Sequence, residues 1–170
     1  MKSNISIVCV INRKGKVIAE HVAKKFDFYS VDVADLLNFN MVDEQKVIET
    51  CGTEYLNKLQ NDAINQVANY YDTVISVHPK FLTEKKNAAI LKKKSIVIFL
   101  KISKGILEEY AKTLKRGVEK SGLLTDVIVC DERNKTISES ADLVLDFNKL
   151  NEVRIIKKII KELEKFAMKI

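Results

Sequence analysis

The chain has 170 residues, of which 46% are hydrophobic and 31% are charged, proportions typical of a globular protein rather than a disordered or fibrous one. Its net charge is +6, but the excess is lysine spread along predicted helix faces, without the interleaved aromatic and arginine residues that suit base stacking, which argues against a nucleic-acid partner. No apolar run reaches the roughly 18 residues of a membrane span and no signal peptide is recognisable, so we expect a cytoplasmic protein with no membrane partner.

Apolar, strand-like runs alternate with helical patterns along the chain. The first run is 5–11 (ISIVCVI), which is followed by a polar break at 12–16 and an amphipathic helix from Val17. Further strands are predicted at 28–31, 73–77, 95–102, 127–130 and 143–147, and further helices at 32–37, 43–51, 53–71, 83–93, 104–115 and 153–168.

The order of these elements predicts the fold class. Strands that are apolar throughout and alternate with helices are typical of a parallel sheet covered by helices on both faces. We therefore expect an α/β protein with three layers, α/β/α. With one proline and five glycines there is no obvious linker, so residues 1–170 are predicted to form one domain.

The first strand is followed by a segment that partly matches a phosphate-binding loop. The pattern GxxxxGK[ST] between a strand and a helix wraps phosphates in backbone N–H groups, with the lysine reaching the outer phosphates. Here Gly15 and Lys16 match, but Val10 replaces the first glycine and Val17 replaces the hydroxyl residue that binds Mg²⁺. A Gly-Lys pair alone is a weak signal, and a surface loop is the simpler interpretation.

Nearly the whole chain nevertheless resembles the shikimate kinase family, small kinases that phosphorylate shikimate with ATP and magnesium. The similar segments are 16–37 (first helix, second strand and next helix), 52–56 (G-E-x-x-F), 74–100 (third strand to fourth strand), 103–110 (S-P-E-x-L-x-x-R), and 132–133 with 140–142 (E-R-x-x-x-Y-x-E-x-A-D). The resemblance implies a P-loop NTPase fold with a five-stranded parallel sheet.

Carried over position by position, the resemblance implies roles for a few retained residues. Gly15, Lys16 and Val17 stand where the family binds nucleotide, Asp32 stands where an aspartate positions magnesium through water, and Arg133 stands where an arginine holds the shikimate carboxylate. ATP and magnesium are the implied cofactors, although the altered loop leaves their binding open.

Other family positions are changed. The aspartate that meets the substrate hydroxyl becomes Ala34, which leaves Asp35, one place later, as a weak candidate base. Asn57 replaces a substrate-binding arginine, residues 78–80 (His-Pro-Lys) replace a substrate-cradling glycine turn, and residues 121–124 (Ser-Gly-Leu-Leu) replace the lid's R-P-L-L. Losing proton acceptance and charge stabilisation together, each a rate factor of roughly 10² or more, should abolish shikimate phosphorylation.

The retained residues also have purely structural interpretations. Asp32 can cap the helix that follows it, Arg133 can be a surface or ion-paired residue, and His78 can serve only the turn after its strand.

Three functions therefore stand side by side. The leading hypothesis is a non-catalytic, shikimate-kinase-like binding or regulatory module for a small anionic ligand, a nucleotide or an unknown protein partner. The second is an active ATP-dependent kinase for shikimate or another hydroxylated acid, and the third is a nucleic-acid-binding domain that rests on charge alone.

Overall fold

The computed structural model of the protein describes residues 2–40 and 43–167. Five parallel strands form one sheet in the order β2-β3-β1-β4-β5. The strands are β1 (Asn4–Cys9), β2 (Tyr29–Asp32), β3 (Thr73–Val77), β4 (Ser95–Lys101) and β5 (Leu143–Asp146). The predicted α/β fold with a five-stranded parallel sheet is confirmed.

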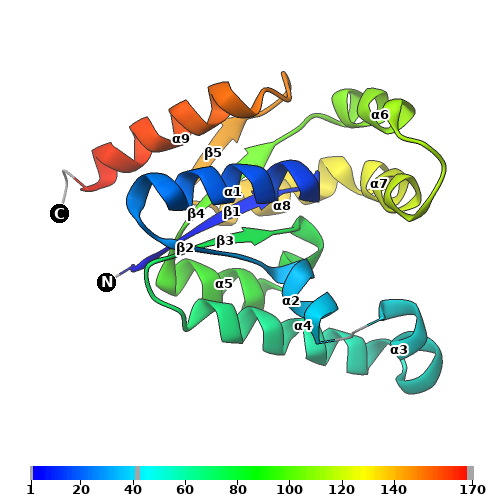
Figure 1. Ribbon diagram of the computed structural model, residues 1–170. Coiled ribbons are helices and arrows are strands. Elements are labelled where there is room, and N and C mark those ends of the chain that lie inside the picture. Colours follow the sequence, from blue (N-terminus) through cyan, green and yellow to red (C-terminus); the bar gives the residue numbers. More distant parts are fainter. Residues whose placement is uncertain (1, 41–42, 168–170) are drawn as a thin grey trace.

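Helices cover both faces of the sheet (Figure 1). On one face α1 (Asn12–Phe26) packs beside α9 (Glu152–Ala167), and on the other lie α4 (Thr53–Ala68), α5 (Lys85–Lys94) and α8 (Cys130–Ser140). The remaining helices are α2 (Val33–Phe39), α3 (Glu44–Cys51), the 3₁₀ turn η1 (Pro79–Leu82), α6 (Lys104–Thr113) and α7 (Val118–Ile128). Within the described ranges no helix is both long and apolar enough to cross a bilayer.

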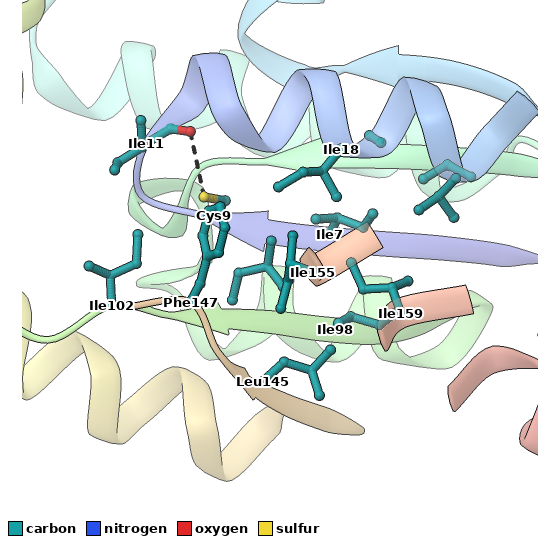
Figure 2. Close-up of a cluster of buried hydrophobic side chains, with 14 of the residues drawn as sticks. Ile7, Cys9, Ile11, Ile18, Ile98, Ile102, Leu145, Phe147, Ile155 and Ile159 are labelled. Carbon is teal, nitrogen blue, oxygen red and sulfur yellow. Dashed lines mark hydrogen bonds between the residues drawn. The ribbon is translucent and has the colours of Figure 1, made fainter. Parts of the chain in front are cut away.

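The central strand β1 divides the core into two halves. All six of its residues are buried, and alternate side chains point to opposite faces, as the pleat requires. Ile7 and Cys9 contribute to the half beneath α1 and α9, where Figure 2 shows them beside Ile18 and Ile155, whereas Val8 contributes to the half beneath α4 and α5. Burying each of these aliphatic side chains contributes about 1.5–3 kcal/mol.

Most predicted elements are present, with shifts of a few residues at their ends. Asp43 begins α3 as expected, because its carboxylate accepts a hydrogen bond from the Lys46 N–H at 3.1 Å. The predicted strand at 127–130 is wrong. These residues form the end of α7 and the start of α8, from which Val127 and Cys130 are buried. A short apolar run does not distinguish a strand from a helical segment.

The first helix also begins earlier than expected. It starts at Asn12 rather than Val17, so the polar segment 12–16 is helical rather than a break. Arginine and lysine are good helix formers, and a single glycine costs only about 1 kcal/mol. That glycine, Gly15, is buried in the first turn of α1 and faces β1.

Replacing Gly15 by alanine is predicted to destabilise the fold. A Cβ at this position would lie 2.8 Å from the Cβ of Cys9, so α1 would have to move away from the central strand. We expect the free energy of unfolding, measured by urea denaturation, to fall by about 1–3 kcal/mol.

Gly122→Ala is the matched control. Gly122 lies within α7, and apart from its chain neighbours and the backbone of its own helix no heavy atom of the described residues lies within 4 Å of a Cβ built there. Helix propensity should therefore make this variant equally or more stable. Equal stability of Gly15→Ala and wild type would show that α1 is not held against β1 as described.

Candidate functional site

The carboxyl ends of the strands open onto a cavity of about 490 Å³. Parallel α/β sheets bind ligands at this edge, because the loops that follow the strands converge there. The cavity is lined from the β1–α1 connection, the end of β3, α6, α7 and α8, by Val10, Ile11, Asn12, Arg13, His78, Lys80, Tyr110, Leu114, Val118, Glu119, Gly122, Leu123, Thr125, Asp126 and Arg133.

The connection between β1 and α1 is only two residues long, Val10 and Ile11. The N–H of Gly15 donates to the carbonyl of Ile11 at 3.0 Å, in the helical pattern. No side chain caps the first turn of α1. The segment that matched the phosphate-loop pattern is therefore a helical turn, and the Gly15 amide is already bonded within the protein.

Lys16 projects from α1 toward α2 and forms an ion pair with Asp35. Hydrogen bonding to this carboxylate raises the pKa of Lys16. Both side chains are largely exposed, so the pair stabilises the fold by at most about 1 kcal/mol. The next residue, Val17, is partly exposed and offers no oxygen. The candidate base, Asp35, and the candidate phosphate-binding lysine, Lys16, are therefore bonded to each other.

Asp32 caps α2, as the structural interpretation predicted. Its Oδ1 accepts a hydrogen bond from the N–H of Asp35 at 2.9 Å. Its Oδ2 is buried and has no hydrogen-bond partner among the described residues, although the Ser76 hydroxyl on β3 is close enough to favour the ionised form. Burial outweighs these contacts and raises the pKa of Asp32.

Beside the cavity, a buried network joins β3, α7 and α8. His78 Nε2 lies 3.1 Å from Asp126 Oδ2, and Arg133 donates to Asp126 Oδ1 at 2.7 Å. His78 Nδ1 accepts from the Lys80 N–H at 3.1 Å, which assigns the ring proton to Nε2, facing the carboxylate. Burial alone would raise the pKa of Asp126, but the bonds from His78 and Arg133 outweigh it and lower that pKa.

Asp126 was not predicted from the sequence. Residues 127–130 were predicted to form a strand, and the residue before them had no predicted role. Asp126 and Arg133 are seven residues apart, close to two helical turns, and that spacing was the one signal available. It could be used only after α7 and α8 had been recognised as consecutive helices.

A second cavity, of about 870 Å³, lies between η1, α2 and α3 and shares Lys80 and Val118 with the first. Across it, Lys80 Nζ donates to both carboxylate oxygens of Glu44, at 3.0 and 3.3 Å. Asn57, predicted to bind substrate, is exposed on α4 and lines neither of these two cavities. The structure thus brings His78 and Arg133 together and leaves Asn57 apart from them.

Lys80 and Arg133, which line these cavities, and Lys16 on α1 are each matched by a carboxylate of the same chain, whereas Arg13, which also lines the first cavity, has no ion pair among the described residues. Lys16 pairs with Asp35, Lys80 with Glu44, and Arg133 with Asp126. Among residues 2–40 and 43–167 no cluster of three or more His, Cys, Asp and Glu side chains could hold a metal ion. The arrangement can bind an anion through Arg13, through a backbone site, or by displacing one of these carboxylates.

Solved structures with the same fold include kinases of small molecules. Shikimate kinase from Bacteroides thetaiotaomicron is 14% identical, with a TM-score of 0.77 over 95% of this chain and 98% of that one. Shikimate kinase from Acinetobacter baumannii in complex with shikimate is 15% identical, with a TM-score of 0.74 over 97% and 94%. A gluconokinase from Sinorhizobium meliloti 1021 is 14% identical, with a TM-score of 0.64 over 98% and 95%.

At such identities these structures show the fold alone. No curated protein matches the chain. The family model for shikimate kinase, however, matches residues 15–164, a stretch that runs from the first turn of α1 almost to the end of α9. The chain therefore belongs to the shikimate kinase family.

Proposed function

We propose that this protein is a non-catalytic member of the shikimate kinase family that acts as a binding or regulatory module. The observation that carries the proposal is the state of the nucleotide position. The segment that would wrap phosphates is helical from Asn12, and Lys16 is paired with Asp35. Shikimate phosphorylation needs free backbone N–H groups around the phosphates of ATP, and the helical segment does not offer them. The exposed Lys16–Asp35 pair is the lesser obstacle, because a competing anion can separate it at little cost.

ATP and magnesium, which the family implies, do not fit the residues present. A phosphate loop surrounds the phosphates with successive free N–H groups, whereas here the Gly15 N–H is bonded to Ile11 and only the first amides of α1 are left for an anion. Val17 has no hydroxyl to offer magnesium, whose octahedral shell is built from oxygen. We therefore derive no phosphoryl-transfer step for this chain.

The acceptor side of the reaction is altered as well. Ala34, on α2, cannot accept a proton, and Asp35 beside it is engaged by Lys16. Ser121 stands in α7 at the position of the lid arginine, so no cation from that position can stabilise a transferring phosphoryl group. Each loss removes a rate factor of roughly 10² or more, and together they leave no useful phosphoryl transfer.

One observation favours the second candidate, an active kinase for a hydroxylated acid. Asp32 is buried, and its Oδ2 has no hydrogen-bond partner among the residues that the structure describes. An ionised oxygen in that state is costly, and a hydrated cation beside it would relieve the cost. Asp32, Lys16 and Arg133 would then bind metal, phosphate and substrate, respectively.

Nucleotide binding is the first test. Calorimetric titration with Mg·ATP and Mg·ADP at millimolar concentration should give no heat of binding, because the phosphate position is helical. Lys16→Ala is the control, since it removes the lysine that the family uses. Binding by wild type that disappears in Lys16→Ala would contradict the proposal and favour the second candidate.

Shikimate phosphorylation is the second test. The purified protein, incubated with ATP, Mg²⁺ and shikimate, should release ADP no faster than buffer when followed by a coupled assay. An authentic shikimate kinase in the same mixture verifies the assay. Shikimate-dependent ADP release by this chain, reduced in Lys16→Ala, would disprove the non-catalytic assignment.

Asp32→Asn distinguishes a structural aspartate from a metal-positioning one. The raised pKa means that the folded state disfavours ionised Asp32, so its cost is present at neutral pH and disappears as pH falls through the folded pKa. Asparagine keeps the cap and removes the charge. We expect the free energy of unfolding to rise by on the order of 1 kcal/mol at pH 7 and to be unchanged near pH 3.

Asp43→Asn is the control for this substitution. Asp43 caps α3 in the same way as Asp32 caps α2, but it is exposed, so its replacement should change stability little at either pH. Thermal unfolding with and without Mg²⁺ completes the test. A rise in Tm with Mg²⁺ in wild type but not in Asp32→Asn would assign Asp32 to a metal.

A further inference from the structure

A groove runs between α5 and α8 on their solvent-facing side. It consists of two adjoining cavities, of about 200 and 280 Å³, which share Leu82 and Thr136. Leu82 and Ile137 at its base are buried, and Ala88 and Ala89 line it with only short side chains. The groove therefore has an apolar floor that is open to another molecule.

The two rims of the groove carry opposite charges. Lys85 and Lys92 line it from α5, whereas Glu132 and Glu139 line it from α8. On each helix the two charges are seven residues apart, close to two turns, so they project to the same side. Among residues 2–40 and 43–167 no ion pair joins one rim to the other. Both rows of charge are exposed and free to pair with another molecule.

The directions of the two helices bring the charges into register. α5 leads directly into β4, and α8 leads through a short connection into β5. Because β4 and β5 are parallel neighbours, the two helices run in the same direction. Lys92 and Glu139, each near the carboxyl end of its helix, therefore lie at the same height on opposite rims, in agreement with the cavity that both of them line.

We propose that this groove is the interface of a symmetric dimer formed with a second copy of the chain. A two-fold axis along the groove lays α5 of each protomer over α8 of the other, so that Lys92 faces Glu139 of the partner subunit. Lys85 likewise faces Glu132 of the partner subunit. An axis across the groove would instead lay lysine over lysine, so the charges select the first arrangement. The dimer uses no residue of the nucleotide position, so its test and that of the proposed function fail separately.

The size of the interface sets the expected affinity. α5 and α8 have 10 and 11 residues, so the shared strip is about 15 Å long and about 20 Å wide. This is smaller than the roughly 800 Å² that each partner contributes to a standard interface. We therefore expect a dissociation constant on the order of 100 µM. Sedimentation equilibrium should show the mass of wild type rising from monomer to dimer across this concentration, and a monomer at every concentration up to millimolar would overturn the proposal.

Charge reversal tests the arrangement of the two protomers. Lys92→Glu or Glu139→Lys alone puts like charges at both symmetry-related contacts, so each variant should dissociate at least about tenfold more readily than wild type. A mixture of the two variants restores opposite charges at both contacts and should form a heterodimer as stable as the wild-type dimer. A mixture that stays monomeric, or a single variant that dimerises like wild type, overturns the proposal.

Matched variants separate the groove from net charge. Lys157→Glu and Glu164→Lys make the same charge changes at exposed positions of α9, on the opposite face of the sheet, and should leave the dimer unchanged. Ala89→Arg places a long side chain in the groove at an exposed position of α5 and should give a monomer whose Tm shows that it is folded. Equal loss of the dimer in the α9 variants, or a dimer of wild-type affinity in folded Ala89→Arg, overturns the proposal.

Discussion

The close approach of α1 to β1 sets the positions of the α1 residues at the carboxyl edge of the sheet. Gly15 allows it, because any larger residue would bring a Cβ within 2.8 Å of Cys9. Cys9 is buried so completely at this contact that its pKa is raised to about 12, which makes its thiol a packing group rather than a nucleophile. With α1 seated there, Asn12 and Arg13 line the cavity and Lys16 faces α2.

Two ion pairs at this edge, Lys16–Asp35 and Arg133–Asp126, differ in burial, and burial decides how easily each can be separated. Lys16 and Asp35 are exposed by 42% and 51%, so water screens their attraction and a competing anion could separate them at little cost. Arg133 and Asp126 are exposed by 16% and 12%, so separating them without replacement would strand a buried charge. The first pair is therefore a weak barrier to ligand binding, whereas the second is expensive to separate.

How much of this could be predicted depends on whether a feature is local in sequence. The Asp43 cap, the strand at 73–77 and the alternation of strands and helices follow from patterns a few residues long, and the structure reproduces them. The early start of α1 was missed because the polar segment 12–16 with its glycine was predicted to be a break, although arginine and lysine are good helix formers. Asp126 was missed because its meaning depends on His78, 48 residues away in sequence, and on a helix taken for a strand.

A buried ion pair is weak support for stability, since apolar residues of similar size often serve as well. What the Asp126 network specifies is position, because Leu123 and Val127 alone could let α7 slide over its apolar neighbours. The same bonds therefore tie α7 to the end of β3 and to α8 in one position.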